Sequence, residues 1–414
     1  MEQKEKIKAI ADQVFQEVMS IRRDLHQHPE LSGEEFRTSK IVADYLEALG
    51  LEVKRGVAKT GVVAHLTGDK ATKGSKVIAF RADMDALPMS EENEHSYCSL
   101  SPNKMHACGH DAHTAILLGA AKILSSLRSE LEGTIKFVFQ PSEEVAPGGA
   151  KPMLDEGIFE DRKPNAVYGL HCFPQLPVGT IGFCPGPMMA AADELYFTIK
   201  GKGGHASAPH RAADPIVAAA QIVMNLQTVV SRNFPPFEPA VLTIGSIHGG
   251  TATNVIPNEV KMLGTFRTMN EELRAMGHQR IEEIVHSTAK AFGCTAELEI
   301  RKGFPAVIND HAMTHFAIAA SKEYLGEKNT LRPDPVMAAE DFSYFLQACP
   351  GSYWQLGVSN ESRGIVHNFH NTRFDIDEEA LRIGSGFISY VACKFLAAEE
   401  AVNLEETASK FGGK

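Results

Sequence analysis

The chain has 414 residues, of which 43% are hydrophobic and 22% charged, and these proportions exclude a wholly disordered protein. This length predicts two or three domains. The formal net charge is −11, with 52 acidic and 41 basic residues. Because phosphate neutralisation requires clustered Lys and Arg, and the sequence contains no such cluster, binding to nucleic acid is not expected.

The sequence also bears on the compartment of the protein. Residues 1–13 carry charges but no apolar run, so no secretory signal is expected. The sequence contains no run of about 18 uninterrupted apolar residues, so no helix that spans a membrane is expected. The seven cysteines are odd in number and scattered, unlike a disulfide framework. Together these features favour a reduced, cytoplasmic protein with no membrane partner.

Predicted helices and strands alternate over the first part of the chain. Apolar residues recur at helical spacing over 7–25 and again over 41–49, where Gly50 suits a helix end. A further helix is expected at 110–127. Short apolar runs rich in β-branched residues predict buried strands at 51–57, 61–67, 76–83, 134–140 and 166–172. This alternation predicts an α/β sheet with covered faces.

The middle of the chain has a different order of elements. Asp214 and Pro215 suit the N-cap and first position of a helix. The predicted elements are a strand at 194–201, a helix at 214–232, strands at 240–250 and 258–268, a helix at 271–292 and a strand at 294–301. This β-α-β-β-α-β order is the split βαβ, ferredoxin-like arrangement.

After Gly303 the first pattern resumes, with helices expected at 310–324 and 380–398 and a strand at 352–358. The polar tail after Glu399 is expected to fray. We therefore predict a two-domain α/β protein. Residues 1–189 and 303–414 form a large α/β domain, and residues 190–302 form an inserted ferredoxin-like domain.

The segment MHACGHDAH, residues 105–113, is the strongest local sign of chemistry. It places four ligand-type side chains just before a predicted helix: His106, Cys108, His110 and His113. A thiolate and an imidazole are good ligands for zinc-like metals. A structural role is the alternative, above all for His113, which lies on the helix, and His106 is undecided.

Further polar residues lie where predicted strands end. Glu143 and Glu144 follow one strand and His171 ends another, and α/β sheets place their sites at such ends. Adjacent carboxylates on extended backbone point in different directions, so one could bind metal while the other acts as a general base. A surface acidic pair is the alternative. Asp83 and Asp85 could be ligands or could orient a ligand imidazole.

The remaining candidates are ambiguous on spacing alone. His367 and His370 lie near the C-terminus, and isolated histidines are more often structural than ligating. His205 lies in a glycine-rich turn of the inserted domain, which also contains Asn254 and Arg267. Such residues usually stabilise loops, so their types and positions alone do not assign them a function.

Eight motifs nevertheless occur in a fixed order over nearly the whole chain. They are RRDLHQHPELSGEE, RADMDALPM, HACGHDAH, FQPSEE, GKGGHASAP, TNVIPNEV, AEDFSYF and FHNTRFDIDEEAL. Together they resemble the amidohydrolase branch of the M20 metallopeptidase family, which includes aminoacylases, hippurate hydrolases, indole-acetyl-amino-acid hydrolases and N-acetyl-diaminopimelate deacetylases. The motifs are specific for the family and much less specific for the substrate.

The resemblance implies a two-metal catalytic site in the large domain, with the inserted domain as a lid and dimerisation surface. It implies that Cys108 touches both ions and that His110, Glu144, His171 and His370 are the other ligands. A soft thiolate argues against a site for magnesium or calcium alone. The expected cofactors are therefore two divalent transition-metal ions per subunit, either zinc, manganese, cobalt or nickel.

The resemblance also implies roles for residues that bind no metal. Glu143 would be the general base, which deprotonates the attacking water and passes the proton to the leaving nitrogen. Asp83 matches the orienting aspartate of the family. His205 would stabilise the oxyanion of the tetrahedral intermediate, and Asn254 and Arg267 would hold the substrate, in some relatives across the dimer.

Two positions depart from the pattern of the wider family. Arg81 stands where other M20 branches have a ligand histidine, which His110 would replace. Thr372 stands two residues after His370, where many relatives have proline. The second departure bears on the geometry of the loop that carries His370.

The expected function is metal-dependent hydrolysis of N-acyl-L-amino acids, N-acetyl, benzoyl or similar, to a carboxylic acid and a free amino acid. The expected partners are this small-molecule substrate and further copies of the chain, in a homodimer or higher homo-oligomer. One alternative is a dipeptidase or aminopeptidase of the same family, against which the motifs around Cys108 and Asp83 argue. The other alternative is a non-catalytic metal-binding dimer. Such a protein would be expected to have lost the general base, and the presence of Glu143 argues against it.

Overall fold

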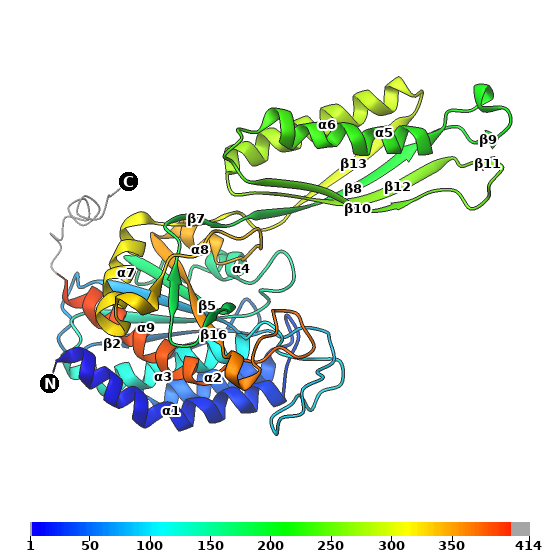
Figure 1. Ribbon diagram of the computed structural model, residues 1–414. Coiled ribbons are helices and arrows are strands. Elements are labelled where there is room, and N and C mark those ends of the chain that lie inside the picture. The colour runs from blue at the N-terminus through cyan, green and yellow to red at the C-terminus, as the bar shows by residue number, and fades with distance from the viewer. Residues whose placement is uncertain (1, 399–414) are drawn as a thin grey trace. The chain divides into compact units, whose positions relative to one another are not determined.

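The computed structural model describes residues 2–398, which divide into two compact units (Figure 1). The larger unit contains residues 2–186, 308–334 and 341–398, and the smaller unit contains 187–307 and 335–340. The sequence predicts that residues 335–340 belong to the large domain, but in the structure they belong to the smaller unit. The polar tail expected to fray lies outside the described residues.

A mixed sheet of eight strands forms the centre of the larger unit, in the order β1-β2-β4-β3-β5-β16-β6-β15. Strand β3 pairs in parallel with β4 and β5, and β5 pairs in parallel with β16. Every residue of β4 is buried, as expected for a strand covered on both faces. The strands are β1 (Glu52–Val57), β2 (Gly61–Thr67), β3 (Val77–Asp83), β4 (Thr134–Gln140), β5 (Ala166–Pro177), β6 (Ile181–Phe183), β15 (Thr330–Leu331) and β16 (Gly351–Ser359).

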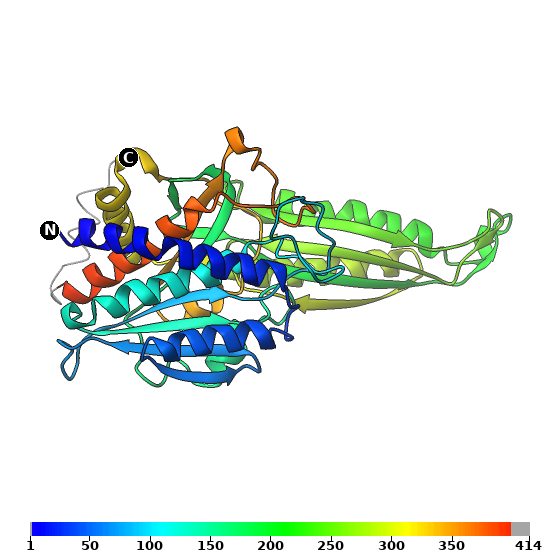
Figure 2. The ribbon, with the colours of Figure 1, turned by 90° about the horizontal axis from the view of Figure 1, so that it is seen from below.

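Helices α1, α3 and α9 pack against one another along the larger unit and lie side by side in Figure 2. Along helix α1 buried residues recur every three or four positions and so share one face: Ile7, Ala11, Val14, Val18, Arg22 and Leu25. The helices of this unit are α1 (Gln3–Gln27), α2 (Phe36–Ala48), α3 (His110–Ser126), α4 (Ala150–Asp155), α7 (His311–Leu325), α8 (Ser343–Ala348) and α9 (Glu379–Ala397).

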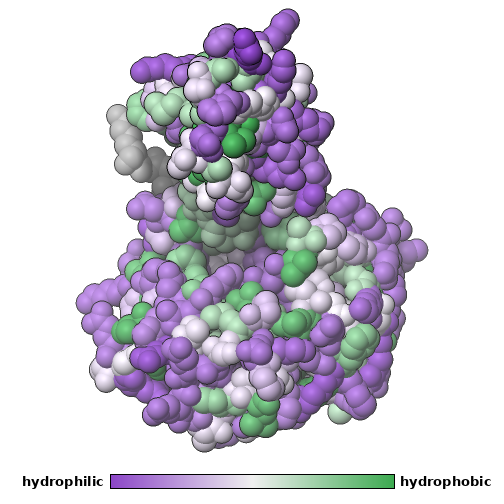
Figure 3. Space-filling view, turned by 90° about the vertical axis from the view of Figure 1, so that its right-hand side faces the viewer, coloured by the Kyte–Doolittle hydropathy of each residue, from purple (hydrophilic) through white to green (hydrophobic). Residues whose placement is uncertain are grey.

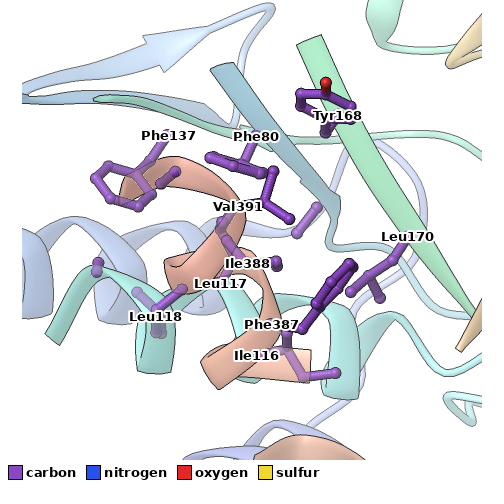
Figure 4. Close-up of a cluster of buried hydrophobic side chains, with 14 of the residues drawn as sticks. Phe80, Ile116, Leu117, Leu118, Phe137, Tyr168, Leu170, Phe387, Ile388 and Val391 are labelled. Atoms are coloured by element: carbon purple, nitrogen blue, oxygen red, sulfur yellow. The ribbon is translucent and has the colours of Figure 1, made fainter. Parts of the chain in front are cut away.

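The main hydrophobic core lies between the sheet and these helices. In Figure 4, Phe80 and Phe137 of the sheet point toward Ile116 of α3 and toward Phe387 and Val391 of α9, and each is at most 1% exposed. Burial of a side chain of this size stabilises the fold by roughly 1.5–3 kcal/mol. The faces of both units seen in Figure 3 are mainly hydrophilic by contrast. Because Ile116 of α3 is part of the same core as Phe80 and Phe137, the core fixes the position of α3 relative to the strands, and His110 is the first residue of α3.

Helix α9 is the one helix of the described residues that is long and apolar enough to cross a membrane. Of its most apolar 18-residue window, 78% is buried inside the protein. Ser385 of α9 donates a hydrogen bond to the carbonyl of Ile116 in α3, at 2.9 Å. A Cβ at Gly119 of α3 would lie 2.5 Å from the Ser385 oxygen, so the two helices approach closely. These contacts are those of a core helix.

The smaller unit has the expected β-α-β-β-α-β order around a four-stranded sheet, β10-β12-β8-β13, in which every pair is antiparallel. Helices α5 and α6 pack on one face of this sheet, over a core that includes Phe197, Ile222 and Ile281. The predicted N-cap of α5 is confirmed, since Asp214 accepts a hydrogen bond from the backbone N–H of Ile216. The elements are β8 (Ala191–Lys200), α5 (Pro215–Thr228), β10 (Ala240–His248), β12 (Glu259–Thr268), α6 (Glu271–Ala291) and β13 (Thr295–Lys302).

Several short elements have no clear sequence signal. A π-helical turn, Val229–Asn233, follows α5, and two short sheets pair β9 with β11 and β7 with β14. These strands are β7 (Gly186–Met189), β9 (Gly204–His205), β11 (Val255–Ile256) and β14 (Val307–Asn309). Single 3₁₀ turns occupy Arg128–Glu130, Pro209–Arg211, Glu327–Asn329 and Glu361–Arg363.

Candidate metal centre

The carboxyl ends of the parallel strands bring the candidate side chains of the larger unit together. Asp83 is the last residue of β3 and pairs with Gln140, the last residue of β4. Glu143 and Glu144 follow in the turn after β4, and His171 lies within neighbouring β5. This edge of the sheet is where α/β folds place their sites.

The five predicted ligands form two groups that share Cys108. One contains Cys108, His110 and His171, the other Cys108, Glu144 and His370, and within each group the ligand-type atoms lie within 4.8 Å of one another. The Sγ atom of Cys108 is 3.4 Å from Nε2 of His171, and Nε2 of His370 is 3.4 Å from Oε1 of Glu144. Ligand atoms on one tetrahedral zinc ion are about 3.3–3.8 Å apart, so these separations suit a shared ion.

The hydrogen bonds of the imidazoles separate candidate ligands from structural histidines. Nδ1 of His171 lies 2.7 Å from the carbonyl oxygen of Cys172, which leaves Nε2 to face Cys108. In His113, Nδ1 lies 2.6 Å from Oδ1 of Asp83, and Nε2 accepts a hydrogen bond from the N–H of Cys172. Both ring nitrogens of His113 are thus engaged, which agrees with the structural role considered for it.

Asp85 holds the turn that carries the two glutamates. Its carboxylate accepts hydrogen bonds from the backbone N–H groups of Glu143 and Glu144, each at 3.0 Å, and from the hydroxyl of Ser32 at 2.6 Å. Its Oδ1 also lies 3.3 Å from Nδ1 of His110. Sequence reasoning leaves the role of Asp85 open, because most of these bonds come from backbone groups that no side-chain pattern reveals.

Whereas Asp85 accepts hydrogen bonds from backbone groups, Asp83 accepts one from the side chain of Arg81. Arg81 donates hydrogen bonds to Asp83 at 2.7 Å and to Asp341 at 2.9 Å, and all three residues are buried. Asp341 also accepts hydrogen bonds from the backbone N–H groups of Gly149 and Ala150 at the start of α4. Arg81 thus neutralises buried carboxylates beside the centre. Asp341 lies in the motif AEDFSYF, but its pairing with Arg81 is visible only in the folded chain.

The charges of the centre favour a cation. Burial lowers the pKa of His110, but the carboxylates of Asp83, Asp85 and Glu144 outweigh burial and raise that pKa to about 10. Burial, together with Glu144 and other carboxylates, raises the pKa of the Cys108 thiol well above its usual value. Nε2 of His110 and Oε1 of Glu144 are buried and have no hydrogen-bond partner among the described residues. Buried polar atoms without partners fit ligands of a metal ion.

The loop that carries His370 has an unusual backbone. His370 has a φ of +55°, in the left-handed region, and its backbone N–H donates to the carbonyl of Ala107 at 2.9 Å. Two residues on, the carbonyl of Thr372 accepts a hydrogen bond from the backbone N–H of Glu92 at 2.8 Å, and its hydroxyl donates to the Glu92 carboxylate at 2.9 Å. These bonds fix the loop at the position where many relatives have proline. His367 belongs to neither ligand group.

The other three candidates lie in the smaller unit. His205 of β9 pairs with Val255 of β11, and these two strands lie together in Figure 1. The carbonyl of Asn254 accepts a hydrogen bond from the backbone N–H of Ala206, so His205 and Asn254 are neighbours. Arg267 lies near the far end of β12, where it donates to a carbonyl in the segment 335–340. The strand from residue 259 to residue 267 spans about 26 Å. Arg267 therefore lies far from His205 and Asn254 within one smaller unit.

Comparison with known proteins places the chain in a family. The sequence profile of the Peptidase family M20/M25/M40 matches residues 79–394. The chain is 39% identical over 400 residues to the IAA-amino acid hydrolase ILR1-like 4 of Arabidopsis thaliana, which covers 96% of this chain and 89% of the relative. It is also 39% identical over 390 residues to an N-acetyl-L-cysteine deacetylase of Bacillus subtilis, and this match covers 94% of this chain and 91% of the relative.

A solved structure agrees with this assignment. The crystal structure of a dinuclear metal-binding peptidase of the M20 family from Bacillus subtilis matches with a TM-score of 0.82 at 35% identity, over 94% of this chain and 99% of that chain. The protein therefore belongs to the M20/M25/M40 peptidase family, as the motifs indicate. It is a metallo-hydrolase that acts on amide bonds.

Proposed function

We propose that the protein hydrolyses N-acyl-L-amino acids to a carboxylic acid and a free amino acid. The observation that carries this proposal is the pair of ligand groups that share Cys108, with the carboxylate of Glu143 beside them. Two relatives support the substrate class by their names, which state hydrolysis of indole-acetyl and N-acetyl derivatives of amino acids.

In this proposal Cys108, His110, Glu144, His171 and His370 would hold two divalent transition-metal ions, and Cys108 belongs to both ligand groups. When bound, the ions would supply Lewis-acid polarisation of the amide carbonyl and would lower the pKa of the attacking water. The thiolate and imidazole ligands favour zinc, manganese, cobalt or nickel over magnesium or calcium alone.

Glu143 is the proposed general base. Its side chain is buried, one of its atoms lies within 4.8 Å of ligand-type atoms of His110 and Glu144, and its backbone N–H is held by Asp85. Its carboxylate would take a proton from the attacking water. It would then give that proton to the amide nitrogen as the carbon–nitrogen bond breaks. In this scheme Asp83 is a positioning residue, because it acts through His113.

We also assign roles to the smaller unit, as a lid and dimerisation domain of ferredoxin-like topology. His205 would donate to the developing oxyanion, while Asn254 and Arg267 would hold the substrate. Because Arg267 lies far along β12 from the other two, these residues would act together only if a second subunit supplied some of them. A strictly monomeric mass by light scattering at micromolar concentration would contradict this arrangement.

The test is release of free amino acid by protein reconstituted with manganese, cobalt, nickel or zinc. The panel contains N-acetyl, N-benzoyl and indole-acetyl amino acids, N-acetyl-diaminopimelate and unmodified dipeptides. Preferential turnover of an acylated amino acid is expected, and Glu143→Gln should lose about 10²–10⁴-fold in rate while it keeps its metal. Cleavage of dipeptides alone would indicate a peptidase, and failure to cleave any substrate would favour a non-catalytic metal-binding protein.

We place the protein in the cytoplasm. All seven cysteines are free, and five of them besides Cys108 are buried. Free, scattered cysteines are typical of proteins in a reducing compartment.

A further inference from the structure

A second cluster of ligand-type side chains lies in the larger unit, separate from the centre described above. It contains His26 at the end of α1, and Glu91 and His95 from the segment between β3 and α3. Nε2 of His26 lies 3.2 Å, and Nε2 of His95 lies 3.4 Å, from the same oxygen of Glu91. Nitrogen and oxygen ligands on one tetrahedral zinc ion, at bonds of about 2.0–2.1 Å, are about 3.3–3.4 Å apart. Both nitrogen–oxygen distances are therefore those of ligands around one ion, and all three atoms lie within 4.8 Å of one another.

The other nitrogen of each imidazole has a partner that orients the ring. Nδ1 of His26 lies 2.8 Å from a carboxylate oxygen of Asp111, and Nδ1 of His95 lies 3.3 Å from Sγ of Cys98. This leaves both Nε2 atoms directed toward Glu91. Nε2 of His95 is buried and has no hydrogen-bond partner among the described residues. Metal-bound histidines characteristically use their second nitrogen in this way, above all toward a carboxylate.

The cluster also has the charge that a divalent cation would balance. Its side chains are shielded from water, since those of His26, Glu91 and His95 are 0%, 3% and 20% exposed. The charged groups in and around the cluster are the carboxylates of Glu91, Asp111 and Asp375 and the guanidinium of Arg22. With neutral imidazoles these four groups sum to −2, and buried uncompensated charge is costly. A carboxylate oxygen of Asp375 lies 3.7 Å from Nε2 of His95.

We propose that His26, Glu91 and His95 form a third metal site, which binds one divalent transition-metal ion, preferably zinc. Two nitrogens and one carboxylate oxygen are a ligand set that zinc accepts, with the fourth position left to Asp375 or water. The alternative is a doubly protonated His26 that bonds Asp111 and Glu91 without a metal, and the test distinguishes the two.

The site would brace the loop that carries His370. Asn93, two residues after Glu91, donates a hydrogen bond to the carbonyl of Phe374, and Tyr97 donates to Asp375. An ion bound to Glu91 and to His26 of α1 would tie this loop to the helix. The existence of the third site is independent of the proposed function, whereas its effect on His370 rests on it.

The test counts metal ions. The full-length protein is stripped with a chelator, loaded with zinc, separated from free zinc by gel filtration, and analysed by mass spectrometry of the metal. The variants are His95→Asn and Glu91→Gln, and the matched control is His28→Asn, because among the described residues the imidazole of His28 has only Asp24 as its hydrogen-bond and ion-pair partner. The parent and the control are expected to bind one more zinc ion per chain than either variant.

Equal zinc content in the parent and in His95→Asn would overturn the proposal and would favour the protonated His26. If His95→Asn does not fold by circular dichroism, Glu91→Gln provides the same comparison, because glutamine keeps the size of the side chain and one acceptor oxygen for the backbone N–H of Ser99. Failure of the two-metal proposal would lower the total in every variant alike. The difference of one ion between the parent and these variants would remain.

Discussion

Replacement of Asp85 by asparagine should loosen the metal centre while the larger unit stays folded. The two oxygens of Asp85 accept hydrogen bonds from the backbone N–H groups of Glu143 and Glu144 and from the hydroxyl of Ser32. Asparagine has one acceptor oxygen, so in either orientation of the amide at least one backbone N–H loses its partner. The loss of a hydrogen bond to a charged group costs about 1.5–3 kcal/mol.

That cost acts on the turn that carries the proposed ligand Glu144, and Asp85 also lies 3.3 Å from the proposed ligand His110. Asp85→Asn is therefore expected to bind metal about 10–100-fold more weakly, which is the usual effect of removing a residue that orients ligands. The assay is competition for zinc with a chelator of known affinity, and circular dichroism confirms the fold. Ser32→Ala is the matched control, because it removes one of the three hydrogen bonds and leaves both backbone N–H groups bonded.

Ser32→Ala should weaken metal binding by less than the roughly 10-fold minimum expected for Asp85→Asn, since both backbone N–H groups of the turn keep their bonds to the carboxylate. Parental zinc affinity in folded Asp85→Asn would refute the reasoning, because the carboxylate would then have no part in shaping the turn. A loss in Ser32→Ala as large as that in Asp85→Asn would refute it equally.

Three other predictions concern stability and metal. Phe387 is fully buried against Trp354, so Phe387→Ala should lower the free energy of unfolding in urea by about 3–5 kcal/mol, and a loss below 1 kcal/mol would contradict its core position. Burial raises the pKa of Asp193, but hydrogen bonds from Arg274 and His278 outweigh it and lower that pKa to about 2. Since the folded value lies below the unfolded value of about 3.9, this carboxylate stabilises the smaller unit by roughly 2 kcal/mol above pH 4 and loses that contribution as pH falls toward 2. Acid titration of unfolding should therefore be flatter between pH 4 and 2 in Asp193→Asn than in the parent. Removal of divalent ions with a chelator should lower Tm, and their return should restore it, because the buried carboxylates of the centre then repel one another; an unchanged Tm would contradict metal binding to the folded chain.

The sequence predicted the helices and strands whose local pattern of apolar residues matches their burial in the fold. The helical spacing of Ile7, Val14 and Val18 reflects a single buried face, and the apolar run 137–139 of β4 reflects burial on both faces. Asp214 and Pro215 marked the start of α5 because capping depends on neighbouring residues alone. The very short strands β9 and β11 gave no such signal, since two-residue pairings have no periodicity to read.

For the centre, residue types and order indicated the candidate metal ligands, and the order of the motifs indicated the family, which the comparisons confirm. The chemistry of thiol, imidazole and carboxylate is intrinsic to each side chain, so it can be read from the chain alone. The roles of the residues around the ligands cannot be read from the chain alone, because these roles depend on which groups the fold brings within hydrogen-bond distance.

Tertiary structure alone therefore decided how Asp83 and Asp85 differ. Both follow β3, yet Asp83 contacts Arg81 and His113, whereas Asp85 accepts backbone hydrogen bonds from the turn after β4. Likewise, the left-handed backbone of His370 and the approach of His26 to residues more than sixty positions away follow from long-range packing. The sequence by itself determined the fold class, the family and the ligand chemistry. Only the folded chain fixed which residues hold those ligands in place, because hydrogen bonds and ion pairs depend on distance in space rather than on separation along the chain.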